Sequence, residues 1–204
     1  GGRKEIRNRL NLREPDILFV AGSTHRGEDE IILGVYSGLK KEHQGLRLLI
    51  APRHVERVQD IEQLIVKHGF KAEKFSSLGP DPRPCPVFIL DTIGNLRTIY
   101  SAADIVFVGG SLVKKGGQNP IEPASLGRPV ITGKFTFNFN DVVRLFLKNN
   151  ACIQINSKEE LCSAIESLLK NPELRKELGN KARETVEKNS GSAQRTIDSI
   201  LSIL

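Results

Sequence analysis

Short, continuous apolar runs alternate with longer stretches of helical periodicity along most of this chain. The run at residues 17–21 is apolar throughout and stops at Gly22, which is typical of a strand buried on both faces. From about residue 29 to 41, apolar residues recur at helical spacing, at Ile31, Ile32, Val35 and Leu39. This alternation predicts an α/β fold.

Further apolar runs predict strands at residues 46–51, 74–78, 87–90, 105–108, 130–132 and 153–155. Helices are expected around residues 58–65, 96–102 and 161–169, with another starting at 172 and a last one at about 192–203. Four prolines within 79–86 predict a loop. Strands separated by helices pair in parallel through right-handed crossovers, so we expect a doubly wound, Rossmann-like parallel sheet of roughly seven strands.

The length of 204 residues predicts one domain, residues 1–204. Lys and Arg total 30 and Asp and Glu total 24, so the net charge is +6. Basic and acidic residues are interleaved and only 5% of residues are aromatic, which argues against nucleic-acid binding. A small anionic ligand or a nearby anionic membrane surface fits the charge equally well.

The three cysteines, Cys85, Cys152 and Cys162, are widely spaced and lack metal-ligand spacing, which favours a reducing compartment and no zinc site. No apolar run is long enough to cross a bilayer, and residues 1–4 contain no hydrophobic signal core. Because the chain does not begin with Met, we expect a soluble piece of a longer protein.

Four loops are expected at the carboxyl edge of the sheet, where ligands bind to such folds. In the first, residues 21–27, glycines allow close backbone approach, and the hydroxyls of Ser23 and Thr24 could bond phosphate or carboxylate oxygens. Glu28 stands where a Walker A loop has lysine, so that motif is excluded. A simple turn in which Ser23 or Thr24 caps a helix remains the alternative.

The second loop, residues 51–57, follows the second strand. Pro52 makes the turn rigid, and Arg53 could direct a permanently charged, bidentate group at a phosphate or carboxylate. Arg57, one turn later, is either a second contact or part of a solvated face.

The third loop, residues 90–96, runs from a strand through a glycine turn into a helix. Backbone groups around Ile93 and Gly94 could read the edge of a planar base while Ile93 packs on its face. A capping turn is the alternative.

The fourth loop, residues 108–130, has the most specific pattern. Gly109, Gly110 and Ser111 leave a strand, and Gly116 and Gly117 permit a second close approach of the backbone. Asn119 is expected to cap a helix with Pro120 in its first turn. Glu122 would then face the cleft, where a carboxylate can accept hydrogen bonds from both hydroxyls of a ribose.

The segments AGSTHRGEDEI, APRHVERV, DTIGNLRTIYSAADIVFVGGSL and GGQNPIEPASLGRPVITGKFTFNF occur here in this order. Together they resemble the C-terminal half of 3-deoxy-D-manno-octulosonic acid (Kdo) transferases, from about residue 15 to 204. These membrane-associated enzymes of lipopolysaccharide biosynthesis have the two-Rossmann-domain glycosyltransferase architecture called GT-B, so the chain is expected to be one half of a GT-B enzyme.

The resemblance implies that this half binds the donor, CMP-Kdo, and that a missing N-terminal domain binds the lipid A precursor. It implies inverting transfer without a cofactor, at the cytoplasmic face of the bacterial inner membrane. No metal is expected either, since the four loops contain no carboxylate pair and no Asp-x-Asp. The family's general base is a Glu of the other domain, so no catalytic residue is expected in this chain and the isolated domain should be inactive.

The resemblance also implies a set of CMP-contacting residues. They are Pro52, Arg53, Ile93, Gly94, Asn95, Asn119, Pro120, Ile121 and Glu122. Weaker candidates from the loops are Ser23, Thr24, Gly110 and Ser111.

Three positions depart from the family pattern: Arg26 stands where an acidic residue is usual, Asn95 where Glu is usual, and Gln118 where His is usual. Two other functions stay open. One is a GT-B domain using a UDP-sugar, and the other is a non-catalytic module that binds anions or RNA.

Overall fold

The computed structural model describes residues 2–79 and 84–201, with side chains as far as residue 189. The strands are β1 (Ile17–Thr24), β2 (Leu46–Pro52), β3 (Ala72–Lys74), β4 (Val87–Ile89), β5 (Ile105–Val108), β6 (Val130–Gly133) and β7 (Ile153–Ile155). They form one sheet in the order β3-β4-β2-β1-β5-β6-β7, and every neighbouring pair is parallel. The expected doubly wound, seven-stranded parallel sheet is therefore confirmed.

The continuous apolar runs of the sequence are explained by burial of the sheet on both faces. Along β1, Leu18 and Val20 pack into the core on one face, and Phe19 and Ala21 pack into the core on the other. All four side chains are completely buried. A strand that is covered on both sides has no polar face, so its sequence shows no alternation.

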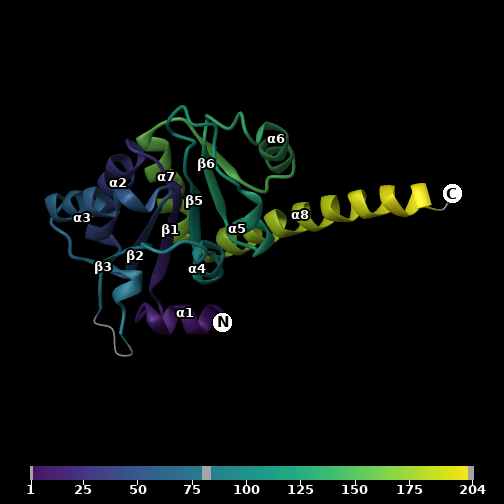
Figure 1. The fold of residues 1–204 in the computed structure, drawn as a ribbon. Helices are drawn as coiled ribbons and strands as arrows, with labels where there is room; N and C mark the ends of the chain where they lie inside the picture. Colours follow the sequence, from purple (N-terminus) through teal and green to yellow (C-terminus); the bar gives the residue numbers. More distant parts are fainter. Residues whose placement is uncertain (1, 80–83, 202–204) are drawn as a thin grey trace.

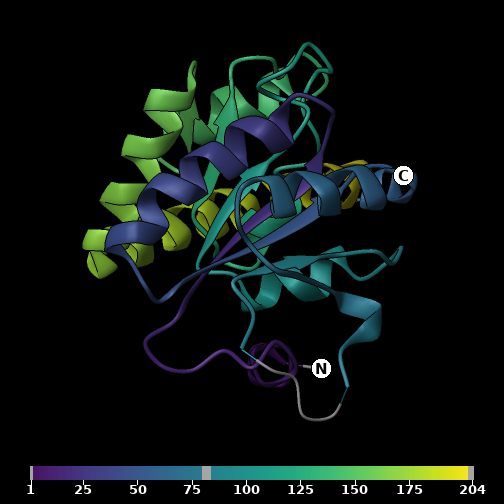
Figure 2. The same ribbon diagram turned by 90° about the vertical axis from the view of Figure 1, so that its left-hand side faces the viewer.

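Two layers of helices cover the sheet. The helices are α1 (Arg3–Arg9), α2 (Glu28–Glu42), α3 (Val58–Lys67), α4 (Leu96–Ala102), α5 (Ile121–Ser125), α6 (Asn140–Lys148), α7 (Lys158–Lys170) and α8 (Pro172–Leu201), with short 3-10 turns η1 (Val55–Arg57) and η2 (Phe75–Ser77). The apolar residues of α2, α3 and α7 pack on one face with Leu174 and Leu178 from the start of α8. Those of α1, α4, α5 and α6 pack on the other face with Ala182 and Val186, farther along α8. Figure 1 gives the arrangement, and α2 and α3 lie in front of the sheet in Figure 2.

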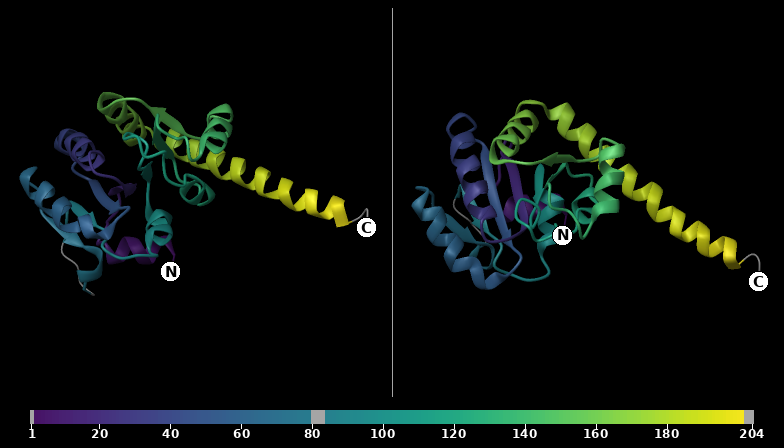
Figure 3. Two further views of the ribbon diagram at one scale, coloured as in Figure 1. Left: turned by 45° about the horizontal axis from the view of Figure 1, so that its top comes forward. Right: turned by 90° about the horizontal axis from the view of Figure 1, so that it is seen from above.

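The long helix α8 begins against the domain and then leaves it. At 30 residues it is about 45 Å long, and it projects well beyond the other elements (Figure 1, Figure 3). Gly179 packs so closely on the turn after α5 that a Cβ atom there would lie 2.2 Å from the Gly127 carbonyl oxygen. The first turns of α8 are thus fixed to the sheet layer by direct backbone packing.

The strand order places the ligand-binding edge. The chain builds β2, β3 and β4 on one side of β1 and then crosses to build β5, β6 and β7 on the other. The switch point therefore lies between β1 and β5. In open parallel sheets the crevice beyond the carboxyl ends of the strands at this point is where ligands bind.

Two expected elements were wrong. The third strand is Ala72–Lys74, and residues 75–77 form a 3-10 turn in place of the expected strand 74–78. In this turn the Phe75 side chain enters the core, and the Ser76 N–H donates to the Asp91 carboxylate at 2.9 Å. These side-chain interactions hold the segment in a turn.

The separate helix expected at about 192–203 is also wrong, because α8 is continuous from Pro172 to Leu201, and residues 202–204 lie outside the described residues. Ion pairs between residues one helical turn apart, such as Glu177–Lys181 at 2.5 Å, stabilise the exposed surface of α8.

Helices α1 and α6 were not predicted from the sequence. Of the proline-rich loop 79–86, residues 80–83 lie outside the described part, and 84–86 are irregular.

Candidate functional site

Backbone hydrogen bonds join the loops that follow β1, β2 and β5. The Arg53 N–H donates to the Thr24 carbonyl at 3.0 Å, and the Gly109 N–H donates to the Gly22 carbonyl at 2.8 Å. Farther along the loop after β5, the Gln118 N–H donates to the Gly109 carbonyl at 3.0 Å. These bonds continue the sheet beyond the strand ends, so the three loops are fixed relative to one another.

Ser23 lies at an irregularity in the pairing of β1 with β2, and its φ of 55° is unusual for a residue with a side chain. Its carbonyl oxygen approaches the loop after β5 so closely that a Cβ atom at Gly109 would lie 2.4 Å from it. Position 109 therefore requires glycine, and the strained backbone at Ser23 marks this edge as a candidate functional site.

Two adjoining pockets of about 290 Å³ and 350 Å³ open at this edge and share four residues. The shared residues are Ser23, Arg53, Gly94 and Leu96. The first pocket is also lined by Ala51, Pro52, His54, Val55, Glu56, Leu90, Thr92 and Ile93. The second is also lined by Arg97, Tyr100, Gln118, Asn119 and Glu122.

Six of the nine residues that the resemblance implied line these pockets. They are Pro52, Arg53, Ile93, Gly94, Asn119 and Glu122. The Ile93 side chain is 85% exposed at the mouth, so it is free to pack against a bound planar group. The Asn119 side chain accepts the Ile121 N–H at 3.0 Å, which fixes the entry to α5 and the position of Glu122 in its first turn.

The other three implied residues lie beside the lining. Asn95 donates from its side-chain amide to the Thr92 hydroxyl at 2.9 Å and so stabilises the glycine turn. Pro120 is buried directly before α5, and Ile121 is partly exposed at its first position.

The weaker candidates fall into two groups. Ser23 lines both pockets, but Thr24 and Ser111 are buried with their hydroxyls donating inward, to Asp29 at 2.7 Å and to the Val108 carbonyl at 2.6 Å. The backbone N–H groups of Gly110 and Ser111 also donate within the protein.

The acceptor for these N–H groups is Glu28, which sequence reasoning missed. Its fully buried carboxylate accepts N–H groups of Gly110 at 2.7 Å and of Ser111 and Leu112 at 3.0 Å each. A fourth bond comes from the His25 N–H at 2.9 Å. The N–H groups of Gly110, Ser111 and Leu112 thus bind a carboxylate of the protein itself, and this internal anion stabilises the conformation of the loop after β5.

Arg57 is the other missed residue, since it forms an interior ion pair instead of part of a solvated face. Its guanidinium donates to the buried carboxylate of Asp29 and, at 2.9 Å, to the Thr24 carbonyl. Burial raises the pKa of Asp29, and the hydrogen bond from Thr24 and the charge of Arg57 partly offset that rise. This pair braces the start of α2 against the loop after β2.

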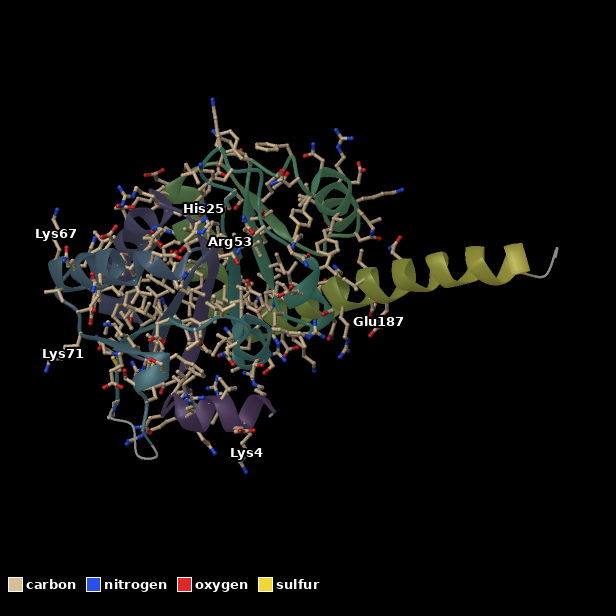
Figure 4. The ribbon with its side chains drawn as sticks, viewed as in Figure 1. Lys4, His25, Arg53, Lys67, Lys71 and Glu187 are labelled. Atoms are coloured by element: carbon tan, nitrogen blue, oxygen red, sulfur yellow. The ribbon has the colours of Figure 1, made fainter. Side chains whose placement is uncertain are left out.

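The charged residues that line the two pockets are two arginines, Arg53 and Arg97, and two glutamates, Glu56 and Glu122. Among the described residues, none forms a hydrogen bond or ion pair with the Arg53 guanidinium. The rings of His25 and His54 meet edge to face at 5.9 Å. Burial lowers the pKa of His25, and the charges of His54, Lys115, Arg57 and Arg53 lower it further. Figure 4 shows His25 and Arg53 near each other in the upper half of the domain, with Lys4 at the bottom.

The three departures from the family pattern have separate surroundings. Arg26 forms an exposed ion pair with Asp60 at 2.9 Å, away from both pockets. Asn95 stabilises the turn described above. Gln118 lines the second pocket, and its amide nitrogen lies 3.2 Å from the His25 Nε2 atom.

A family model described as glycosyl transferases group 1 matches residues 86–185. The 3-deoxy-D-manno-octulosonic acid transferase of Haemophilus influenzae is 41% identical over 182 residues, covering 89% of this chain and 43% of that protein. The C-terminal CMP-Kdo binding domain of WaaA from Acinetobacter baumannii superimposes with a TM-score of 0.83 at 25% identity, covering 90% of this chain and 95% of that one. The chain belongs to the Kdo transferase family.

The similarity corresponds to the C-terminal part of Kdo transferases. The enzyme of Aquifex aeolicus is 36% identical over 151 residues, which cover 74% of this chain and 41% of that protein. The chain thus spans less than half the length of these curated relatives. Anabaena Alr3699/HepE has a TM-score of 0.70 at 14% identity over 99% of this chain and 52% of its own, which indicates the shared GT-B fold.

Among the described residues, one group of side chains could hold a metal. It comprises Glu42, His43 and Glu166, whose potential ligand atoms lie within 4.8 Å of one another. It lies at the C-terminal end of α2, about 20 Å along that helix from its first turn. None of the described helices is both long and apolar enough to cross a bilayer.

Proposed function

We propose that this chain is the donor-binding half of a Kdo transferase, which moves Kdo from CMP-Kdo to a lipid A precursor in lipopolysaccharide biosynthesis. The observation that carries the proposal is the unpaired guanidinium of Arg53, which lies between two pockets whose other charged residues include Glu122. The name of the structural neighbour from Acinetobacter baumannii supports the choice of donor.

In this proposal Arg53 binds the CMP phosphate, because a guanidinium matches phosphate geometry and keeps its charge at any physiological pH. Glu122 accepts hydrogen bonds from the ribose hydroxyls. Pro52, Ile93 and Gly94 line the pocket for the cytosine base, with the exposed side chain of Ile93 against its face.

The reaction forms a bond between an acceptor hydroxyl oxygen and the anomeric carbon of Kdo, and it breaks the bond from that carbon to the phosphate oxygen. CMP leaves with the bonding electrons, so negative charge grows on its phosphate and Arg53 stabilises it. Attack from the face opposite the phosphate inverts the anomeric configuration. We place the general base in a separate N-terminal domain that binds the acceptor, at the cytoplasmic face of the inner membrane.

Isothermal titration of the chain with CMP tests the assignment. We expect Arg53→Ala and Glu122→Ala each to weaken CMP binding by roughly ten- to a hundredfold, since a hydrogen bond to a charged group contributes about 1.5–3 kcal/mol. Lys71→Ala removes one positive charge from an exposed site elsewhere and should leave the affinity unchanged. Unchanged CMP affinity in both the Arg53→Ala and the Glu122→Ala variants would contradict the assignment of the CMP site to these pockets.

The same titration separates the alternatives. A domain for UDP-sugars would bind UDP more tightly than CMP. An RNA-binding module would lose affinity steeply with salt and would be indifferent to Glu122→Ala. We propose that the donor site works without a metal, so EDTA should not alter CMP affinity.

A further inference from the structure

The donor in the proposed function carries two anionic groups on one carbon atom. Kdo is an ulosonic acid, so its anomeric carbon bears a carboxylate as well as the bond to the CMP phosphate. The two groups must therefore bind side by side. A site that places the phosphate at Arg53 needs hydrogen-bond donors or positive charge directly beside it for the carboxylate.

Gln118 and His25 lie at this place and have no part in the CMP contacts assigned above. Gln118 shares the second pocket with Arg53 and Glu122. Its amide nitrogen lies 3.2 Å from His25 Nε2. A Cβ atom at Gly110 would come within 3.5 Å of both side chains, so the bare backbone there leaves them space.

The charge around these side chains is positive and is not neutralised locally. Lys115 lies two residues before Gly117, whose N–H donates to the Gly110 carbonyl at 2.8 Å, so this loop segment lies beside the two side chains. The charge of Lys115 also lowers the pKa of His25, and its exposed ammonium group forms no hydrogen bond or ion pair with the described residues. The nearest buried carboxylate, Glu28, already accepts four backbone N–H groups and is shielded from the pocket. An anion of the ligand is the missing partner.

We propose that Gln118, His25 and Lys115 form a subsite for the carboxylate of the donor sugar, beside the phosphate at Arg53. This inference rests on the proposed function and adds the means by which an ulosonic-acid donor is selected. With Gln118 donating to His25 Nε2, the imidazole keeps its proton on Nδ1. Gln118 retains a second N–H for the ligand, and Lys115 supplies the charge.

The subsite would act as a specificity device. A UDP-hexose has hydrogen at the position of the carboxylate, so it would gain no charge-assisted hydrogen bond from Gln118 or from the exposed Lys115. An ulosonic-acid donor would gain these bonds and would bind more tightly for that reason. CMP alone would leave the subsite to water and would bind through Arg53 and Glu122.

The test compares the affinities of the 204-residue chain for CMP and for freshly prepared CMP-Kdo, measured by competition. Gln118→Ala and Lys115→Ala should weaken CMP-Kdo binding about tenfold and leave CMP binding within twofold, because only the sugar carboxylate loses a charge-assisted hydrogen bond. Lys114→Ala is the matched control, since Lys114 stacks near the Phe135 ring at 6.0 Å and is not among the charges acting on His25.

A second variant at position 118 distinguishes the loss of a ligand contact from a loss of folding. Gln118→Glu keeps the size of the side chain and brings a like charge to the ligand carboxylate, so CMP-Kdo affinity should fall further than in Gln118→Ala. Equal effects on both ligands, or none on either, would overturn the subsite while CMP binding through Arg53 still stood. Failure of the unsubstituted chain to bind CMP would instead overturn the proposed function.

Discussion

Glu28 shows how one buried carboxylate can shape a ligand-binding edge without touching a ligand. An ionised group without partners would be costly in the interior, yet this one accepts four backbone N–H groups. Three of these groups come from the loop after β5, so its conformation is set before any ligand arrives. Preorganised loops lose less entropy on binding.

Glu28→Gln should lower the free energy of unfolding by about 2–3 kcal/mol, because an amide NH₂ would face N–H donors and leave a buried one unsatisfied. CMP affinity should fall as well, since the same loop leads into Asn119 and Glu122, which line the second pocket. Urea denaturation and titration with CMP measure the two effects.

Glu30→Gln provides the control for this substitution. Glu30 lies on the same first turn of α2 and accepts one exposed N–H, from Gly27 at 3.1 Å. Its substitution should change the free energy of unfolding by less than about 1 kcal/mol. Equal stability of the two variants would contradict the role given to Glu28.

The difference between Arg53 and Glu28 shows what local sequence can reveal. Arg53 was identified because a strand, a proline and an arginine are consecutive, and their placement at the sheet edge follows from the fold. Glu28 was considered only as the absence of a Walker lysine, because three of its four partners lie 82–84 residues away. Which N–H groups it meets depends on the β1–β5 pairing, and no local pattern records this.

Among the elements, the strands buried on both faces were easiest to predict and β3 was the hardest. The runs that became β1, β2 and β5 have only apolar residues at their centres, whereas β3 lies at the edge of the sheet and reads Ala-Glu-Lys. Its pairing with β4 comes from the backbone, while apolar Phe75 and Leu78 serve the adjoining turn and core. Hydrophobic pattern therefore placed the strand a few residues too late.

Helix α8 depends on a contact between two glycines that its sequence periodicity does not show. Gly179→Ala should lower the free energy of unfolding by about 1–2 kcal/mol, because the new Cβ would lie 2.2 Å from the Gly127 carbonyl oxygen and push the helix outward. Urea denaturation, followed by circular dichroism, measures this loss.

Gly38→Ala is the matched control, also within a helix. Nothing lies within 4 Å of a Cβ atom at this exposed position of α2. The added methyl group should therefore stabilise the protein by about 0.5–1 kcal/mol through helix propensity. Opposite signs for the two glycines would confirm that packing against Gly127 decides the result, and a stabilised Gly179→Ala variant would contradict it.

In the molecule as a whole, topology gathers the chemistry at one end. The loops after β1, β2 and β5 meet at the switch point. Apart from Glu122 and Glu56, the charged side chains of these loops that are not in buried ion pairs are cations. Such an edge can bind an anionic donor and stabilise a leaving phosphate. Apart from Glu122, which we propose binds the ribose, and the exposed Glu56, no described residue that lines the two pockets offers a carboxylate to take a proton from an acceptor on the opposite side of the sugar.

We therefore expect the 204-residue chain to bind CMP while transferring no detectable Kdo from CMP-Kdo to a lipid A precursor. General acid–base catalysis contributes about 10²–10⁴-fold by itself, and the acceptor would also lose the positioning that a second domain provides. Mass spectrometry of the lipid product, with a full-length Kdo transferase as positive control, measures transfer. Turnover by this chain alone, lost in a Glu122→Gln variant that still binds CMP, would instead make Glu122 the base and require a different residue for the ribose.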